Sequence, residues 1–239
     1  MAELRLLSYN VRSLRDDADA VGDVIRGCAV DVVAVQEAPR FLRWRSKRAA
    51  LARKSGLVVA SAHRPGGLTV LTSMRAKVLD TSFALLPKTP KLHQRAVCGV
   101  LLEIAGERWA IVSVHLSLSD EERWQHLEPL WDAVRRWDAP LVVAGDINEK
   151  PDGRVWKALA SELQDAYAVA PDGPGDTYST RRPVRRIDGV FADPSVTVAG
   201  CHAVQGDGPE SVSAERLKAA SDHWPVLAVL RRQSSQGRA

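Results

Sequence analysis

Residues Ser221-Asp222-His223-Trp224-Pro225-Val226 place an acid and an imidazole directly ahead of an apolar run that is typical of a strand. Similar polar groups stand at the ends of other apolar runs earlier in the chain. They are Ser8-Tyr9-Asn10, Val35-Gln36-Glu37, Ser113-Val114-His115, Gly145-Asp146-Ile147-Asn148 and Arg186-Ile187-Asp188. Because nearly all of them fall where a strand is predicted to begin or end, the sequence predicts one site assembled from several strands.

The composition is that of an ordinary globular protein, with 45% hydrophobic and 26% charged residues in a chain of 239. We expect a single domain over residues 1–232, because no segment has the composition of a linker, and a frayed polar tail over residues 233–239. The net charge of +4 fits an anionic substrate, although many proteins without such a partner have a similar charge.

Cysteine usage and hydropathy favour a cytoplasmic location. Cys28, Cys98 and Cys201 are isolated and odd in number, which predicts buried reduced thiols and neither a disulfide framework nor a CxxC zinc site. The N-terminus lacks the layout of a signal peptide. No apolar run approaches the roughly 18 residues that a membrane-spanning helix needs. We therefore expect a protein that does not span a membrane, and a monomer.

Predicted strands outnumber predicted helices. The strands are Leu4–Tyr9, Val30–Gln36, Leu57–Ala62, Leu68–Thr72, Lys77–Leu86, Arg95–Ile104, Arg108–Val114, Leu141–Ala144, Ile187–Phe191, Val196–Val204 and Trp224–Leu230. The helices are Asp16–Cys28, Arg40–Lys54, Ser119–Trp137 and Asp152–Leu163. Some neighbouring strands are joined by turns and others by helices, which favours an α/β fold with two packed mixed sheets and helices outside.

The helix over Ser119–Trp137 has the clearest pattern. Ser119 and Glu122 have the spacing of a capping box. Trp124, Leu127, Trp131 and Val134 recur every three or four residues and predict a buried stripe. A tryptophan-rich partner surface is the alternative, but core packing is the usual reason for this spacing.

Two strand-end residues suit a divalent metal ion. Asn10 and Glu37 follow predicted strands directly, and their amide and carboxylate oxygens are hard ligands suited to Mg²⁺ or Mn²⁺. Taken one at a time, each also fits a structural role, with Asn10 starting a turn and Glu37 capping a helix.

The remaining strand-end residues suit chemistry at a phosphate. Asp146 and Asn148 lie two apart, so both can face one side, and Gly145 would allow a sharp exit from the strand. An Asx turn before a helix explains the same residues equally well. Asp188 and His223 suggest a carboxylate–imidazole pair that favours the charged imidazole and could stabilise developing negative charge.

The ordered series SYNVR, VQE, SVHLS, AGDIN, RIDGVF and SDHWPV resembles the endonuclease/exonuclease/phosphatase superfamily from Leu4 to Leu230. That superfamily includes pancreatic-type deoxyribonucleases, apurinic endonucleases, sphingomyelinases and inositol-polyphosphate phosphatases. The resemblance implies a four-layer α/β sandwich, with two mixed sheets face to face and helices outside. It also implies phosphoester hydrolysis by an activated water with a divalent metal.

The resemblance also implies roles for individual residues. Asn10, Glu37 and Asp222 match metal-side positions, and His115 matches the first histidine, which contacts the scissile phosphate. Asp146 matches the acid that activates water, Asn148 its phosphate-orienting neighbour, and Asp188 the acid that supports His223. One departure is Arg12, which stands where apurinic-type members carry an acid. It argues against an abasic endonuclease and puts a second metal ligand from that turn in doubt.

Basic clusters bear on the substrate. Residues 40–54 contain seven basic side chains, no acid, and the aromatics Phe41 and Trp44. Residues 181–186 contain four arginines close to Asp188. Such clusters could hold a nucleic-acid backbone, or the first could be a solvated helix face. We expect Arg45, Arg95 and Arg186 to bind substrate.

Together these patterns favour a Mg²⁺-dependent phosphodiesterase, most simply a nuclease. A phosphatase or a phospholipase-type phosphodiesterase acting on a lipid or small phosphorylated metabolite is the alternative. An inactive phosphate-binding module would be expected to lack some of the polar groups that are present. A serine hydrolase is disfavoured because no G-x-S-x-G elbow occurs, and GDIN lacks the second acid of a calcineurin-like two-metal site.

Overall fold

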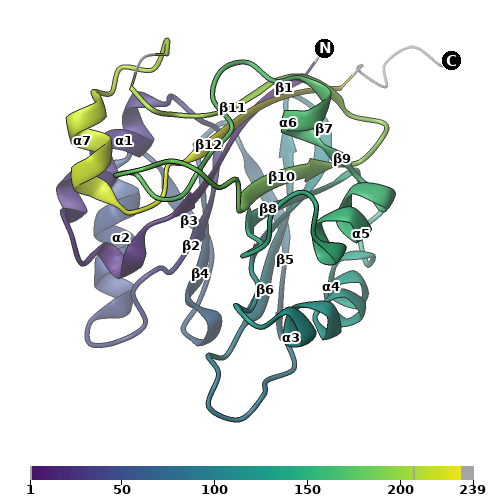
Figure 1. The fold of residues 1–239 in the computed structure, drawn as a ribbon. Helices are drawn as coiled ribbons and strands as arrows, with labels where there is room; N and C mark the ends of the chain where they lie inside the picture. Colours follow the sequence, from purple (N-terminus) through teal and green to yellow (C-terminus); the bar gives the residue numbers. More distant parts are fainter. Residues whose placement is uncertain (1, 207, 233–239) are drawn as a thin grey trace, which may run out of the picture.

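Two six-stranded sheets pack face to face in this computed structural model, which describes residues 2–206 and 208–232 (Figure 1). The first sheet contains β1 (Ala2–Asn10), β2 (Val32–Gln36), β3 (Val58–His63), β4 (Leu68–Thr72), β11 (Thr197–Ala203) and β12 (Val226–Arg232). The second contains β5 (Lys77–Leu85), β6 (Ala96–Ile104), β7 (Glu107–His115), β8 (Leu141–Asp146), β9 (Gln164–Asp165) and β10 (Asp188–Ala192).

Both sheets are mixed. Their strand orders are β11-β12-β1-β2-β4-β3 and β5-β6-β7-β8-β10-β9. At the centre of each sheet lies a parallel pair, β1 with β2 and β7 with β8. On the other side of each pair an antiparallel strand returns, β12 beside β1 and β10 beside β8. The ends of the parallel strands therefore meet the beginnings of β12 and β10 at one edge of the sandwich.

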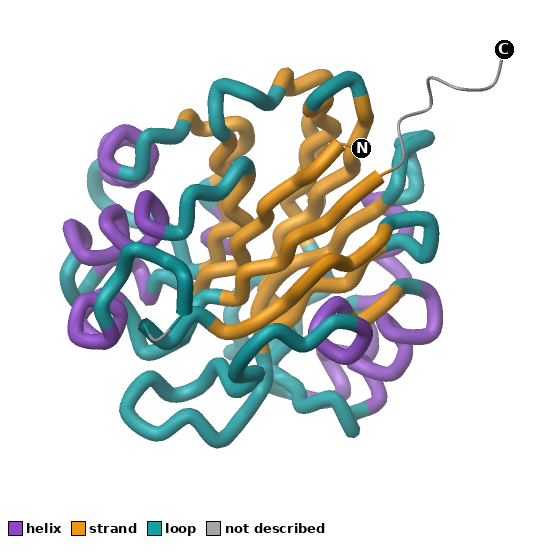
Figure 2. Tube along the Cα trace, turned by 90° about the horizontal axis from the view of Figure 1, so that it is seen from above, coloured by secondary structure: helices purple, strands orange, loops and turns teal. Residues whose placement is uncertain are grey.

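Helices cover the two outer faces, and Figure 2 shows the strands lying between the two groups of helices. The helices are α1 (Ala18–Gly27), α2 (Trp44–Lys54), α3 (Asp120–Gln125), α4 (Leu127–Val134), α5 (Arg154–Glu162), α6 (Ala166–Val169) and α7 (Ala214–Ala220), with short 3-10 turns η1 (Arg12–Leu14) and η2 (Pro65–Gly67). In the described part of the chain, no helix is both long and apolar enough to cross a membrane. The predicted four-layer sandwich is confirmed.

Strand alternation creates the layers. In β1, Leu4 and Leu6 lie in the core between the sheets, whereas Leu7 and Tyr9 pack in the core under α1 and α7. Successive side chains of a strand point to opposite faces, so a strand with helices on one side and a sheet on the other is apolar on both. The continuous apolar runs of the sequence follow from this arrangement.

The core between the sheets ends in a polar layer. Gln36 is fully buried at the end of β2, and its Nε2 donates to Ser113 Oγ of the other sheet at 3.1 Å and to Ala34 O at 3.0 Å. Ser113 Oγ in turn donates to the Val35 carbonyl at 3.3 Å. These hydrogen bonds join the two sheets and satisfy polar groups that would otherwise cost free energy in an apolar layer.

The predicted helix over Ser119–Trp137 is two helices, α3 and α4, that share a boundary at His126. Pro129 explains the break, because a proline in a helix clashes with the carbonyl four residues earlier, and that residue, Gln125, is the last of α3. The prediction of a buried Trp124 is wrong, since its side chain is 44% exposed. Half of the predicted capping box is confirmed, with Ser119 Oγ accepting from the Glu122 N–H, but the Ser119 N–H donates to Ser117 Oγ instead of to Glu122.

Other boundaries moved or were missed. The second predicted helix begins at Trp44 because residues 40–43 form a loop that ends on the left-handed Arg43. The elements β9, α6 and α7 are too short or too weakly patterned to stand out in the sequence. All three cysteines are buried and free, as predicted. The predicted tail over 233–239 lies outside the described residues.

Arg48 differs from the rest of the basic segment. It is 1% exposed, and its guanidinium donates to the carbonyls of Pro39, His63 and Leu68 at 3.0, 2.9 and 2.8 Å. Burial lowers the pKa of Arg48 to about 10. This arginine therefore fastens α2 to the loop that follows β2 and is not available to a substrate.

Replacing Arg48 should destabilise the fold. We expect Arg48→Met to lower the free energy of unfolding by about 3 kcal/mol, because several buried carbonyls would lose their donor. Arg45→Met on the exposed side of the same helix should change it by less than about 0.5 kcal/mol. Urea unfolding followed by circular dichroism measures both; equal effects would contradict the structural role of Arg48.

Candidate active site

Strand register brings the polar strand ends together. Across the second sheet His115 pairs with Asp146, and Asp146 pairs with Asp188. Asn10 ends β1 of the facing sheet, and His223 lies just ahead of β12, which runs beside β1. Five residues from five strand ends thus meet at the polar edge between the sheets.

Asp146 lies at the centre of the cluster and is 2% exposed. Its Oδ2 accepts from Asn10 Nδ2 at 3.0 Å and lies 3.4 Å from His115 Nε2 and 3.9 Å from His223 Nε2. Its Oδ1 accepts from the Asn148 N–H at 2.9 Å. Burial raises the pKa of Asp146, and the nearby charge of Asp188 raises it further. A carboxyl group with a raised pKa is better able to take a proton near neutral pH.

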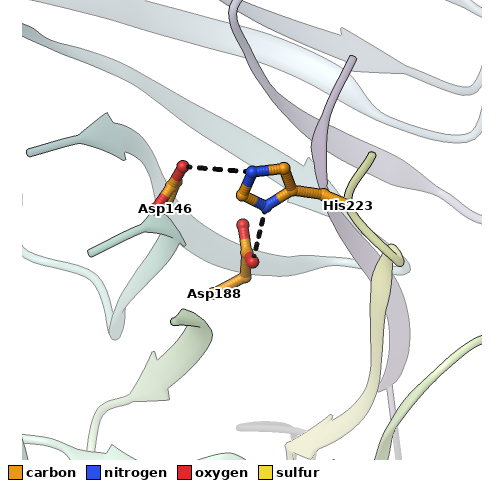
Figure 3. A group of neighbouring side chains, drawn as sticks. All are labelled: Asp146, Asp188 and His223. Atoms are coloured by element: carbon orange, nitrogen blue, oxygen red, sulfur yellow. Dashed lines mark hydrogen bonds and ion pairs between the residues drawn. The ribbon is translucent and has the colours of Figure 1, made fainter. Parts of the chain in front are cut away.

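His223 forms the predicted pair with Asp188 (Figure 3). Its Nδ1 lies 2.9 Å from Asp188 Oδ2, so this nitrogen carries a proton and the other, Nε2, faces Asp146. Burial alone would lower the pKa of His223, but the charge and hydrogen bond of Asp188 outweigh burial and raise it. The pair therefore favours a charged imidazole.

Asp188 is itself held in place from a loop. Thr177 is fully buried, and its Oγ1 accepts from the backbone N–H groups of Ile187 and Asp188 at 3.1 and 3.2 Å. The neighbouring Tyr178 ring lies 4.8 Å from the His223 ring. Neither Thr177 nor Tyr178 carries a sequence pattern that would single it out, because both lie in a long Gly- and Pro-rich loop.

His115 behaves differently from His223. Burial lowers its pKa well below the usual value, and the positive charges of Arg95 and His223 lower it further. His115 Nδ1 has no hydrogen-bond partner in the described part of the chain. A neutral His115 imidazole can form a hydrogen bond with an uncharged or anionic group of a ligand without adding a positive charge to the site.

The backbone turns sharply where the site residues leave their strands. Glu37, Asn148 and Arg12 have φ angles of 50°, 57° and 44°, in the left-handed region that non-glycine residues rarely adopt. Such strained positions gather at functional sites. Gly145 is needed for a different reason from the one predicted: a Cβ there would lie 2.0 Å from the Val114 carbonyl of the neighbouring strand.

A cavity of about 460 Å³ opens over this cluster. It is lined by Arg12, Ser13, Arg15, Glu37, Arg40, Gly66, His93, Arg95, His115, Leu118, Asp146, Asn148, Tyr178, Arg185, Ile187, Asp222 and His223. A larger cavity of about 580 Å³, lined by Trp137, Asp138 and Arg232 among others, contains none of the predicted site residues. Its polar groups form no histidine–carboxylate pair, so it lacks the chemistry that the smaller cavity offers.

Arg95 is the most unusual cation of this cavity. It is 8% exposed, yet its guanidinium makes no hydrogen bond or ion pair with any residue that the structure describes. Burial lowers its pKa, while the charges of Asp146 and Glu37 oppose the change. A nearly buried guanidinium that opens onto a cavity without a partner is suited to bind an anion.

The other predicted substrate arginines lie elsewhere. Arg45 is exposed on α2 and does not line the cavity. Arg186 is held by Asp165 through two hydrogen bonds of 2.8 and 2.9 Å. Arg40 and Arg185, each a neighbour in the same basic segments, line the cavity instead.

The predicted metal residues divide into two groups. Asn10 Nδ2 donates to Asp146 Oδ2 at 3.0 Å and to Glu37 Oε1 at 3.4 Å, so two carboxylates converge on the Asn10 amide. The Asn10 Oδ1 accepts from the Arg12 N–H at 3.1 Å, and the amide would have to rotate to offer this oxygen to a cation beside the carboxylates. Asp222 lines the same cavity, and its carboxylate lies 3.4 Å from Arg12 Nε.

Asp146, Asp188 and His223 also have ligand atoms within 4.8 Å of one another. The Asp188–His223 hydrogen bond already uses two of these groups, and a protonated imidazole does not ligate a metal. The oxygen donors Glu37, Asp146 and Asn10 fit a hard divalent cation better.

Solved structures share this fold. An endonuclease/exonuclease/phosphatase from Bacteroides vulgatus aligns with a TM-score of 0.80 at 20% identity, covering 98% of this chain and 100% of that one. A mannosyl-6-phosphatase from Bacteroides thetaiotaomicron aligns with a TM-score of 0.77 at 17% identity, covering 95% and 99%. The human Nocturnin catalytic domain with bound sulfate aligns with a TM-score of 0.74 at 16% identity, covering 97% and 95%.

No curated protein matches the chain in sequence. The pattern of the Endonuclease/Exonuclease/phosphatase family, however, matches residues 7–223, which include every residue of the cluster described above. The order of the strand-end residues, their convergence in one cavity and this match agree. The chain belongs to the Endonuclease/Exonuclease/phosphatase family and is, at that level, a phosphoesterase.

Proposed function

We propose that the protein is a divalent-metal-dependent phosphodiesterase that cleaves a phosphate ester by in-line attack of water. The observation that carries this proposal is the placement of the Asp188–His223 pair beside Asp146 in the same cavity as the unpartnered Arg95 guanidinium. The first three groups suit proton transfer and charge stabilisation, and Arg95 suits the phosphate.

Arg95 and Asn148 hold the phosphate in this mechanism. The Asn148 side chain donates one N–H to the Leu116 carbonyl at 3.0 Å, which orients the amide and leaves its second N–H for an oxygen of the substrate. His115, neutral and 4% exposed, contacts the same phosphate. Fixed donors that need no rearrangement are the main source of transition-state stabilisation at such sites.

Asp146 and His223 act on the reacting atoms. Asp146 positions the attacking water and takes its proton as the bond from water oxygen to phosphorus forms and the ester P–O bond breaks. The charged His223, oriented by Asp188, stabilises the negative charge that grows on the phosphoryl oxygens. Asp188 is a positioning residue, because it acts through His223.

Glu37 and Asn10 are the residues that would hold Mg²⁺ in this mechanism while Asp146 acts as the base, and their oxygens also suit Mn²⁺. When bound, the cation offsets charge on the phosphate and the leaving oxygen. In this proposal Asp222 forms an ion pair with Arg12 and orients that side chain.

A second class of substrate also fits the site. The burial of Arg48 and the pairing of Arg186 remove two cations that would support a nucleic-acid backbone. A phosphomonoester is therefore the second candidate, and the fold similarity to a mannosyl-6-phosphatase supports it. An inactive module is disfavoured because the polar groups converge.

Metal removal and loss of Asp146 should each abolish hydrolysis. We expect the wild-type protein with Mg²⁺ to hydrolyse bis-p-nitrophenyl phosphate, a diester, faster than p-nitrophenyl phosphate, a monoester. Excess EDTA, or Asp146→Asn, should reduce release of p-nitrophenol to background. Activity that survives in EDTA would refute metal dependence, and a preference for the monoester would favour the second candidate.

Loss of the Asp188 charge should slow catalysis without weakening binding. We expect Asp188→Asn to lower kcat by about 100-fold with little change in KM, because His223 would lose the partner that orients it. Asp193→Asn, at the other end of β10, is the matched control and should leave kcat unchanged. A rise in KM with unchanged kcat would contradict the role assigned to Asp188.

Arg95 should matter for binding. We expect Arg95→Gln to raise KM by about tenfold, because a charge-assisted hydrogen bond to the phosphate is lost. Arg45→Gln removes the same charge outside the cavity and should leave KM unchanged. Steady-state kinetics on the diester at fixed ionic strength make the comparison; equal changes would show a general charge effect instead.

A further inference from the structure

A second cavity of about 330 Å³ lies next to the active-site cavity. It is lined by Lys150, Pro151, Tyr167, Gly175, Asp176, Val184, Arg185 and Arg186. Arg185 lines both cavities. Asn148 lines the first, and Lys150, two residues further along the same turn, lines the second. The two cavities are therefore neighbours that share a wall.

The charges of the second cavity are unevenly paired. Arg186 is neutralised by Asp165 and stacks on the Trp156 and Tyr167 rings at 4.7 and 5.0 Å. Lys150 and Arg185, in contrast, are exposed and form no ion pair with any described residue. One acid, Asp176, also lines the cavity. Two free cations against one acid leave a net positive charge.

The walls of this cavity are fixed by contacts that do not depend on a ligand. The Tyr167 hydroxyl donates to the Gly173 carbonyl at 3.1 Å. The Arg185 guanidinium lies 4.7 Å from the centre of the Tyr178 ring, and that ring lies beside His223. Arg185 is thus held at the junction of the two cavities by a side chain that belongs to the active site.

We propose that the second cavity is a subsite for a second phosphate group of the substrate, bound by Arg185 and Lys150 while the scissile phosphate lies over Asp146. This inference rests on the proposed function for the position of the scissile phosphate. Arg185 and Lys150 then select substrates with two phosphates. Arginine and lysine side chains that line a cavity and form no ion pair are suited to bind a phosphate dianion.

A binding experiment tests the subsite without turnover. Isothermal titration would compare thymidine 5′-monophosphate with thymidine 3′,5′-bisphosphate, which differ by one phosphate. We expect the bisphosphate to bind the wild-type protein about tenfold more tightly, as a charge-assisted contact provides. This advantage should fall to less than about twofold in Arg185→Gln and shrink in Lys150→Gln.

Arg182→Gln is the matched control, because Arg182 is exposed on the same loop and lines neither cavity. It should keep the full advantage of the bisphosphate. Equal affinities for the two nucleotides in the wild-type protein would overturn the subsite. The subsite would also be overturned if Arg182→Gln reduced the affinity advantage of the bisphosphate as much as Arg185→Gln does. That result would mean that the second phosphate is attracted only by the long-range positive charge of the loop.

A second pair, fructose 6-phosphate and fructose 1,6-bisphosphate, distinguishes the source of the second phosphate. An advantage confined to the nucleotide pair assigns the subsite to nucleotide substrates, and one confined to the sugar pair assigns it to sugar phosphates. Hydrolysis is measured separately. If no phosphoester is cleaved with Mg²⁺ the proposed function fails, whereas the binding comparison still decides the subsite.

Discussion

The arrangement of the candidate active site depends on the single layer of side chains that the two sheets share. Inward-facing residues of both sheets fill one core, which contains Leu4 and Leu6 of β1 and Val142 and Ala144 of β8. The same faces of these two strands end in Asn10 and Asp146, which therefore lie close together. The hydrogen bond from Asn10 to Asp146 joins the two sheets at that end. Just below it, Gln36 and Ser113 make a similar connection. A change in the register of one strand would turn its site residue away from the cavity.

The short distances between these buried polar groups also determine the electrostatics of the site. Asp146 and Asp188 are both 2% exposed and lie in neighbouring strands, so the charge of Asp188 disfavours the charged form of Asp146. His223 lies between them and relieves the repulsion. Placing such groups in a core generally costs stability and is tolerated where function needs it. The left-handed turns at Glu37 and Asn148 add to that cost.

Sequence patterns predicted most strands and most of the residues that gather at the candidate site, because the end of a buried strand is recognisable as an apolar run followed by a polar residue. They failed where the deciding contact is not local. Trp124 has the spacing of a buried residue, but Pro129 ends the helix early and the indole remains partly outside. Arg48 and Arg45 are equivalent in the sequence, yet only Arg48 meets three backbone carbonyls from other segments.

By itself, the sequence determined the apolar runs that end in a polar residue, and with them the strands of the fold and the order of the site residues. These features depend on residue type and spacing along single strands. Only the tertiary structure decided which cations line the candidate active site. Arg95, Arg40 and Arg185 line the cavity over Asp146, whereas Arg186 and Arg48 do not and are held by protein groups. The physical reason is that a charge acts on whatever lies within a few ångströms, and those neighbours come from distant parts of the chain.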